Sequence, residues 1–199
     1  MKLTKNELRD RQRKLTQLER YLPTLKLKKA MLQSCVSQAE QEIAELRAAA
    51  AEVEQRVRAF QSLFSQSAAR DLIASVHIES LKTGSENIAG VEIPTFESIA
   101  FSTPSFLRFD RPLWLDSAIL ITRSLVEAKE RVGIAEQKKG ALEKELREVS
   151  IRVNLFEKVM IPRTRAEVKK IRLFLSDQEL SAVAMSKVAK QKIEKRKAS

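Results

Sequence analysis

Apolar side chains recur at alternating steps of three and four residues along the first third of the chain, and fourteen of the fifteen positions in this series are apolar. The series comprises Leu15, Leu18, Leu22, Leu25, Lys29, Leu32, Val36, Ala39, Ile43, Leu46, Ala50, Val53, Val57, Phe60 and Phe64. A mean step of 3.5 residues keeps a narrow apolar seam on one face of a supercoiling helix. An amphipathic helix on a globular core has a broader stripe and a shorter length. The pattern therefore predicts a long coiled-coil helix.

A second seam of the same spacing occupies the last third of the chain, with eleven of twelve positions apolar. It comprises Ile121, Leu125, Ala128, Val132, Ala135, Lys139, Leu142, Leu146, Val149, Val153, Phe156 and Met160. Each narrow seam requires a partner seam, and the nearest one belongs to the other helix of the same chain. The predicted fold is all-α dominated: a long antiparallel two-helix coiled coil with a small β-hairpin and loop insertion at the turn.

Each predicted helix contains one proline. Pro23 removes a backbone donor and crowds the preceding turn, so we expect it to kink or locally break the first helix, which should start near Thr4. Pro162 poses the same problem in the second helix. The apolar positions beyond it change phase, to Val168, Ile171 and Leu175. We therefore expect a bend or a phase shift near Pro162.

The segment between the seams contains the signals of a β-hairpin. β-branched residues flank Gly84, which predicts residues 75–81 paired with 86–93 and a turn at this glycine. Residues 95–112 contain two prolines and four phenylalanines, among them Phe101, Phe106 and Phe109, and predict an irregular loop.

The second helix is expected to begin after this loop. Asp116 and Ser117 can each cap its N-terminus. The predicted organisation is an N-terminal coiled-coil arm (1–74), a hairpin and loop cap (75–116) and a C-terminal coiled-coil arm (117–199), within one elongated domain.

Composition agrees with exposed helices better than with a compact globule. Aromatic residues make up 5% of the chain and charged residues 32%, which leaves little bulky apolar surface for a core. No run approaches the roughly 20 consecutive apolar residues that cross a bilayer. We expect a cytoplasmic protein that reaches a membrane only through a partner.

The net charge of +11 is concentrated near the two ends of the chain. Residues 1–30 contain 10 basic and 3 acidic side chains, and residues 163–199 contain 11 and 4. An antiparallel pair brings these stretches together into one basic end, which favours acidic partners. Nucleic acid is one such partner, although Tyr21 and Phe174 are the only aromatic residues there for stacking bases. A solvated end that keeps the chain soluble is the other interpretation.

The residues that nucleophilic or metal chemistry needs are scarce. The chain has one cysteine, Cys35, and one histidine, His77. Cys35 adjoins a seam position and is interpreted as a small core residue, and His77 falls in the predicted hairpin. No paired ligands and no phosphate-binding glycine loop occur. We expect no catalytic residue, no metal and no cofactor.

Several stretches closely resemble the D subunit of V-type and A-type ATPases. The most specific is RVNLFEKVMIPRTRAEVKKIRLFLSDQEL (152–180). NIAGVEIP (87–94) and WLDSAI (114–119) are similar to the middle of that family, in the same order and spacing. TKNELRDRQRKL (4–15) and LKLKKAML (25–32) are similar to its opening helix. The resemblance covers nearly the whole chain.

This resemblance implies a non-catalytic central rotor shaft. The family's coiled coil enters a hexamer of alternating A and B subunits, where ATP is hydrolysed or made. It pairs with the small F subunit of the stalk, and its lower end rests in a funnel-shaped subunit that couples to the membrane ring. It transmits torque, and proton or sodium transport is thereby coupled to ATP. No nucleic acid and no direct membrane insertion are expected.

Two sets of candidate contact residues follow. The dense basic stretch after Pro162 supplies candidate contacts to the hexamer: Arg163, Arg165, Lys169, Lys170 and Arg172. The hairpin has an apolar face that a two-stranded ribbon cannot bury alone. Its residues Val76, Ile78, Val91 and Ile93 are candidate contacts to the F subunit.

Two other classes remain as alternatives. A prefoldin-like coiled-coil chaperone also has a helix, central strands and a returning helix, but its client-holding tips need exposed apolar residues where this chain is rich in lysine. A basic coiled-coil nucleic-acid-binding protein would bind DNA in a salt-dependent way.

Overall fold

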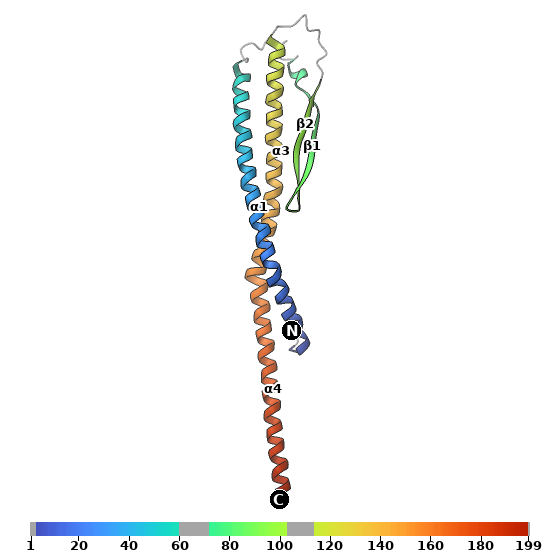
Figure 1. Ribbon diagram of the computed structural model, residues 1–199, viewed down its shortest axis with the longest axis vertical. Coiled ribbons are helices and arrows are strands. Elements are labelled where there is room, and N and C mark those ends of the chain that lie inside the picture. The colour runs from blue at the N-terminus through green and yellow to red at the C-terminus, as the bar shows by residue number, and fades with distance from the viewer. Residues whose placement is uncertain (1–2, 60–71, 103–113, 199) are drawn as a thin grey trace. The chain divides into compact units, whose positions relative to one another are not determined.

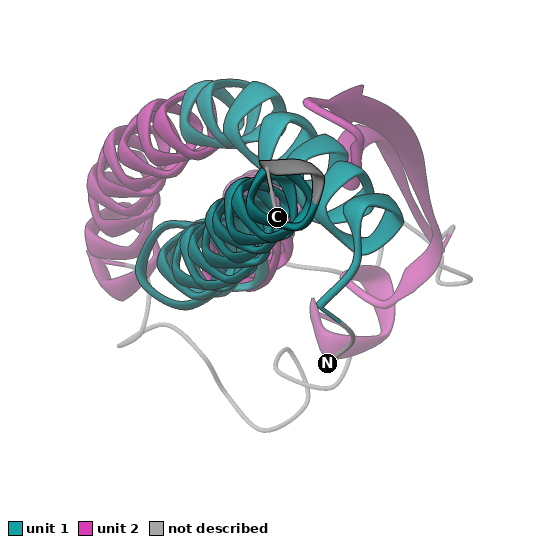
Figure 2. Ribbon diagram, turned by 90° about the horizontal axis from the view of Figure 1, so that it is seen from below, with its two compact units in different colours: residues 1–28, 148–199 teal, residues 29–147 magenta. Residues whose placement is uncertain are grey.

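The computed structural model describes residues 3–59, 72–102 and 114–198 (Figure 1). Its elements are α1 (Lys5–Ala59), β1 (Ile78–Ile88), β2 (Val91–Phe101), α3 (Trp114–Asn154), the π-helix η3 (Leu155–Met160) and α4 (Ile161–Ala198). The chain forms two compact units (Figure 2): unit 1 contains residues 1–28 and 148–199, and unit 2 contains residues 29–147. Both units draw on both predicted arms. The three-segment organisation stays a prediction.

The start of α1 is fixed by Thr4. The Glu7 amide donates to Thr4 Oγ1 at 3.3 Å, and the Leu8 amide donates to the Thr4 carbonyl at 3.0 Å. Thr-x-x-Glu is the sequence of a capping box, which satisfies amides that the first turn leaves without partners. The predicted start near Thr4 is confirmed.

The expected break at Pro23 is absent, because α1 runs through it as one helix of 55 residues. Pro23 lies on the exposed side of the helix, where water can hydrate the carbonyl that lacks an amide partner. Leu22 and Leu25, on either side, are partly buried in the seam. Seam packing therefore outweighs the local cost of the proline.

The seams predicted from the sequence are the buried positions of the helices. In α1, five of the thirteen seam residues that the structure describes are buried and the other eight are partly buried. In α3, Leu142 is 0% exposed and Val149 1%. Phe60 and Phe64 lie outside the described residues. The predicted coiled-coil fold with a small hairpin is confirmed.

Ion pairs in unit 2 show that α1 and α3 are antiparallel. Four join the helices: Glu54 to Lys129 at 3.8 Å, Arg47 to Glu136 at 2.6 Å, Glu42 to Lys138 at 2.7 Å and Glu40 to Lys139 at 2.9 Å. Each step back along α1 pairs with a step forward along α3. The pairs flank the seam and fix its register.

In unit 1 the start of α1 pairs in the same antiparallel sense with η3 and α4. The ion pairs are Lys26 to Glu157 at 2.7 Å, Glu19 to Arg165 at 2.7 Å, Arg11 to Glu167 at 3.0 Å and Lys5 to Glu179 at 3.3 Å. The buried residues beneath them include Leu18 on α1 and Val168 and Ile171 on α4.

The phase shift predicted near Pro162 is confirmed, and η3 produces it. Val149 and Val153 are buried and follow the heptad spacing, whose next two seam positions are Phe156 and Met160. Met160 is only partly buried, and Ile161 is buried instead. The Ile161 amide donates to the carbonyl of Phe156, five residues earlier. The wider turn takes up one extra residue directly before a proline that has no amide to donate.

The hairpin is longer than predicted, and its turn lies elsewhere. β1 and β2 pair antiparallel with Ile88 opposite Val91, so the loop is Ala89–Gly90 rather than Gly84. Both loop residues have positive φ (53° and 82°), the geometry of a turn whose twist matches a hairpin. The Gly90 amide donates to Asn87 Oδ1 at 2.9 Å. The predicted turn was therefore wrong.

Gly84 has a different purpose inside β1. It pairs with Thr95, and a Cβ at this position would lie 2.7 Å from both Thr95 Oγ1 and Glu97 Oε1. The glycine thus makes room for side chains of the opposite strand, beside a register shift between Lys82 and Thr83. Residues 95–101 belong to β2, so the loop prediction was wrong there.

The other expectations for the middle segment are only partly answered. Phe106 and Phe109 lie outside the described residues, as do Pro104 and Pro112. The described part of α3 begins at Trp114, which places Asp116 in its first turn and corrects the expectation that Asp116 or Ser117 caps the helix. A carboxylate there still favours the positive end of the helix dipole.

A second face of α3 covers the base of the hairpin in unit 2, which the seam pattern did not predict. Leu72, Leu115, Ala118 and Ile119 form a buried cluster, and Val76 and Trp114 pack against it. Figure 1 shows the hairpin alongside α3. α3 is therefore buried on two faces, one towards α1 and one towards the hairpin.

Candidate functional site

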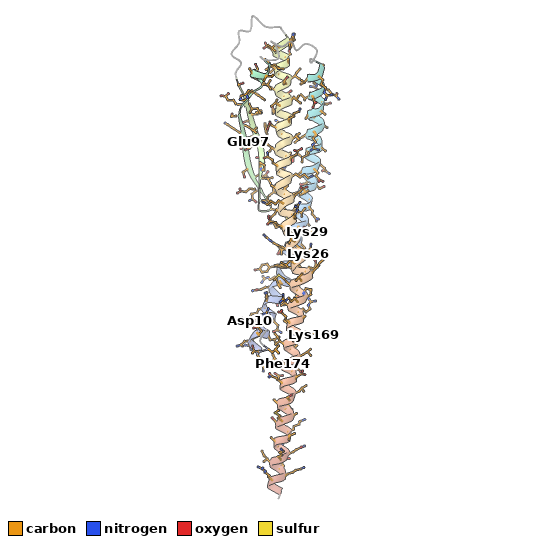
Figure 3. All side chains as sticks on the ribbon, turned by 180° about the vertical axis from the view of Figure 1, so that it is seen from behind. Asp10, Lys26, Lys29, Glu97, Lys169 and Phe174 are labelled. Atoms are coloured by element: carbon orange, nitrogen blue, oxygen red, sulfur yellow. The ribbon has the colours of Figure 1, made fainter. Side chains whose placement is uncertain are left out.

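The basic stretch after Pro162 lies on the exposed side of α4. Ile161, Thr164, Val168 and Ile171 occupy the buried face, at alternating steps of three and four residues. Four of the five predicted hexamer contacts fall between them and Arg172 directly follows Ile171, and all five are exposed. Figure 3 shows Lys169 on α4, shortly before Phe174. The helix thus brings the five cations onto one outward surface, which we call the basic surface (Arg163, Arg165, Lys169, Lys170 and Arg172).

Two of these cations are already paired within unit 1. Arg163 contacts Glu167 at 3.3 Å and Arg165 contacts Glu19 at 2.7 Å. Within the described residues, no ion pair involves Lys169, Lys170 or Arg172. The charge of these three side chains is therefore available to an acidic partner.

Glu167 also forms an ion pair with Arg11, which connects α4 to α1. The pKa of Arg11 is raised by its hydrogen bond from Nε to Glu7 and then by the nearby Glu167 carboxylate. Arg11 is therefore held in its charged form. Glu167 and Glu19, the carboxylates that contact cations of the basic surface, are thus held in ion pairs within unit 1.

Beyond Glu179 the helix α4 has no packing partner among the described residues. Every described side chain from 176 to 196 is exposed, and the pair between Lys5 and Glu179 is the last ion pair between α1 and α4 in that part of the chain. Figure 1 shows α4 continuing past the N-terminus of α1 in the same unit. Large apolar side chains stay open to solvent there: Leu180, Val183, Met185, Val188 and Ile193. We call residues 180–196 the α4 extension.

A lone helix with exposed apolar side chains is marginal in water without a partner. The extension is also basic, with Lys187, Lys190, Lys192, Lys195 and Arg196. Sequence reasoning found these cations but missed the extent of the unpaired helix. The sequence carried no signal of it, because the seam phase of Val168, Ile171 and Leu175 continues through Ala182 and Met185.

The four predicted contacts to the F subunit are unequal in exposure. Ile93 is 1% exposed, so its side chain is buried within unit 2. Val76 packs against the buried cluster at the hairpin base, and Ile78 and Val91 are partly buried. Ile73, nearby, is 71% exposed. The apolar surface that the hairpin region offers to a partner is therefore at its base rather than around Ile93.

An apolar groove marks this base. Its lining comes from the start of the hairpin and from α3: Leu72, Ile73, Val76, His77, Ile78, Thr122 and Val126. His77, the single histidine, lies here as an exposed side chain. We call these residues the hairpin-base groove.

Charged residues within unit 2 are held by their neighbours. Lys139, which interrupts the second seam, contacts Glu40 at 2.9 Å and Glu143 at 3.4 Å, and its hydrogen bond to Glu40 raises its pKa. The pKa of Glu54 is lowered by its hydrogen bond from Arg58 and by Lys129. The lysine in the seam is therefore compensated by carboxylates from both helices.

No group of three or more His, Cys, Asp or Glu side chains that could hold a metal ion occurs in the part of the chain that the structure describes. Over the same residues, no helix is both long enough and apolar enough to cross a membrane.

A paired coil with a tethered hairpin and an unpaired basic extension defines a coiled-coil structural protein, one whose exposed surfaces suit other proteins. The family model of the ATP synthase D subunit matches residues 7–191. The chain belongs to this family of ATP synthase D subunits. This confirms the resemblance predicted from the sequence, and with it the role of a central-stalk component of a rotary ATPase.

Relatives named as the D subunit of V-type ATP synthase are similar over nearly their whole length. The one from Chlamydia felis is 46% identical over 198 residues, covering 99% of this chain and 95% of the relative. That from Chlamydia pneumoniae is 43% identical over 199 residues, covering 100% and 95%. That from Chlamydia trachomatis serovar L2 is 42% identical, covering 99% and 98%.

Proposed function

We propose that this chain is the shaft of the rotor in a V-type ATP synthase, and that the basic surface and the α4 extension contact the A and B subunits of the catalytic hexamer. The observation that carries this proposal is the α4 extension, a helix with open apolar and basic side chains and no partner among the described residues of its own unit. A shaft inside a ring of subunits needs such a segment, because the ring supplies the missing packing.

Charge suits a shaft that must change contacts as it turns. Exposed cations attract acidic surfaces over several ångströms without requiring one fixed fit, whereas a deep apolar contact resists rotation. Lys169, Lys170 and Arg172 are the cations most open to such contacts, since no ion pair involves them within the described residues.

The F subunit is proposed to bind the hairpin region and the adjoining coiled coil. The hairpin-base groove is a better candidate for the F contact than Ile93, because a partner cannot reach a side chain that is 1% exposed. A funnel-shaped subunit would couple the shaft to the membrane ring. The chain itself carries no active site in this proposal, and ATP is handled where A and B subunits meet.

The experiment neutralises Lys169, Lys170 and Arg172 together to glutamine, in the complete complex. We expect weaker association with the A and B hexamer, or ATP hydrolysis that no longer drives ion transport, because three uncompensated cations lose their partners. Assembly is measured by co-purification, and coupling by ion uptake per ATP hydrolysed.

A matched triple variant tests whether any three exposed cations have this effect. Arg56, Lys144 and Arg147 are residues of unit 2 that take part in no ion pair among the described residues. Changed together to glutamine, they should leave assembly and coupling near the wild-type level. Equal effects of the two triple variants, or no effect of either, would contradict the proposed hexamer contact.

A further inference from the structure

Both ends of the β-hairpin meet at one arginine of α3. Arg123 donates from Nε and Nη2 to the carbonyl oxygen of Ser75, at 2.9 and 2.7 Å. Nη2 also donates to the carbonyl oxygen of Ser102, at 2.8 Å. Ser75 lies just before β1 and Ser102 directly after β2. One guanidinium therefore holds the chain where it enters the hairpin and where it leaves.

Further contacts close this junction. The Ser102 amide donates to the His77 carbonyl at 2.9 Å, and Ser102 Oγ donates to the Ala74 carbonyl at 2.8 Å. The Arg123 guanidinium lies 5.2 Å from the centre of the Phe101 ring. Ser75 is 0% exposed, so loss of Arg123 would take hydrogen bonds away from a buried carbonyl.

The remainder of the hairpin is held by contacts of other kinds. Arg131, two turns further along α3, lies 4.8 Å from the Phe96 ring, but its side chain is 48% exposed and also pairs with Glu127. A cation–π contact at an exposed site is weaker than a set of charge-assisted hydrogen bonds to carbonyls that are buried or partly buried. Ile93 adds one buried apolar side chain near the turn. Charge-assisted hydrogen bonds are thus concentrated at the Arg123 end.

We infer that Arg123 is a positioning residue: it fixes both ends of the hairpin to α3 and thereby sets the orientation of the hairpin-base groove. That groove includes Thr122, the neighbour of Arg123 on the same helix, and Val76, the neighbour of Ser75. The consequence for the F subunit rests on the function proposed above, whereas the positioning itself can be measured in this chain alone.

Lysine cannot replace arginine at this position. Three hydrogen bonds to two carbonyls use the rigid fork of a guanidinium, whereas an ammonium group is a point charge on a flexible stem. Arg123→Lys should therefore restore charge but only part of the geometry. A role that depended on charge alone would be restored in full by lysine.

The test measures a distance between spin labels in the full-length chain. Labels at Glu92→Cys and Gln137→Cys, both exposed in unit 2, report the position of β2 against α3 in a Cys35→Ala background. We expect one narrow distance distribution for the unaltered Arg123 and a broad one for Arg123→Gln, with Arg123→Lys between them. Hydrogen exchange at the Ser102 amide should become roughly tenfold faster or more in Arg123→Gln.

Arg152→Gln is the matched control. Arg152 is an exposed arginine of the same helix whose partner is Glu148, four residues earlier. It should change neither the label distance nor the exchange of Ser102. An unchanged distance distribution and unchanged exchange in Arg123→Gln would overturn the inference, as would full restoration by lysine.

Affinity for the F subunit separates this inference from the proposed function. If Arg123→Gln releases the hairpin and weakens F binding, positioning and F placement are both supported. If it releases the hairpin while F binds as before, positioning is supported and the F placement fails. If F binding falls while the hairpin stays fixed, the positioning inference is contradicted.

Discussion

The coil of unit 2 and the α4 extension of unit 1 are built from similar helices, but their apolar side chains are buried in the first region and exposed in the second. In unit 2, α3 is covered by α1 on one face and by the hairpin on another, and four ion pairs flank the seam with α1. In the extension, Leu180 is 67% and Met185 72% exposed. The first region uses its apolar residues for its own stability, and the second keeps them available to a partner.

The first and largest expected effect concerns the spacing of the seams. Deleting Lys144, an exposed residue of α3, rotates the helix beyond it by about 100° and moves Leu146, Val149 and Val153 off the seam. Each loses burial of roughly 1.5–3 kcal/mol, so we expect a large fall in the unfolding temperature, measured by circular dichroism.

Deleting Val159 from η3 should have a much smaller effect. η3 already contains one residue more than an α-helix needs, so the deletion, combined with Pro162→Ala, converts it into α-helix and leaves Ile161, Val168 and Ile171 on the seam. Equal losses of stability from the two deletions would contradict the interpretation of η3 as a phase correction.

The second prediction compares the two regions by one substitution. Leu142→Ala removes a side chain that is 0% exposed, and we expect a loss of about 2–5 kcal/mol in the free energy of unfolding. Leu180→Ala, at a position 67% exposed, should stay within about 0.5 kcal/mol in the isolated chain. Denaturant unfolding of both variants measures the difference. A comparable loss from Leu180→Ala would mean that the extension is packed within the chain.

The smallest expected effect is a dependence on pH. The pKa of Glu54 is lowered in the folded chain, from 4.5, by Arg58 and Lys129. A carboxylate with a lowered folded pKa stabilises the fold at pH values above its unfolded pKa and loses that contribution as the pH falls through the folded value. The difference in unfolding temperature between wild type and Glu54→Gln should therefore shrink with acidification below about pH 4.5. If the difference in unfolding temperature between wild type and Glu54→Gln grew on acidification, the prediction would be contradicted.

The seams could be predicted because heptad spacing follows directly from helix geometry. The same pattern could not predict the second buried face of α3, since Leu115, Ala118 and Ile119 are covered by Leu72 and Val76, which lie in the segment before the hairpin. The turn was misplaced because Gly84 and Gly90 are equivalent signals in the sequence. Only the structure shows that Gly90 adopts positive φ and that Gly84 makes room for side chains of β2.

The surfaces proposed as partner contacts were predictable to a similar degree. The basic surface follows from charge density together with helical spacing, so its exposure could be anticipated. The role of Arg123 could not be predicted from the sequence, because its partners are the backbone carbonyls of Ser75 and Ser102, which are far from it along the chain. The burial of Ile93 could not be predicted either, because burial of a strand residue depends on what packs against it.

The central claim is that the α4 extension is held inside the A and B hexamer. The most direct measurement is photocrosslinking in the complete complex, with a photoreactive residue replacing Met185 of the extension and, as the control, Glu143 of unit 2. We predict crosslinks from position 185 to the A and B subunits, at one copy of this chain per hexamer. Absence of such crosslinks from position 185 in an active complex would contradict the account.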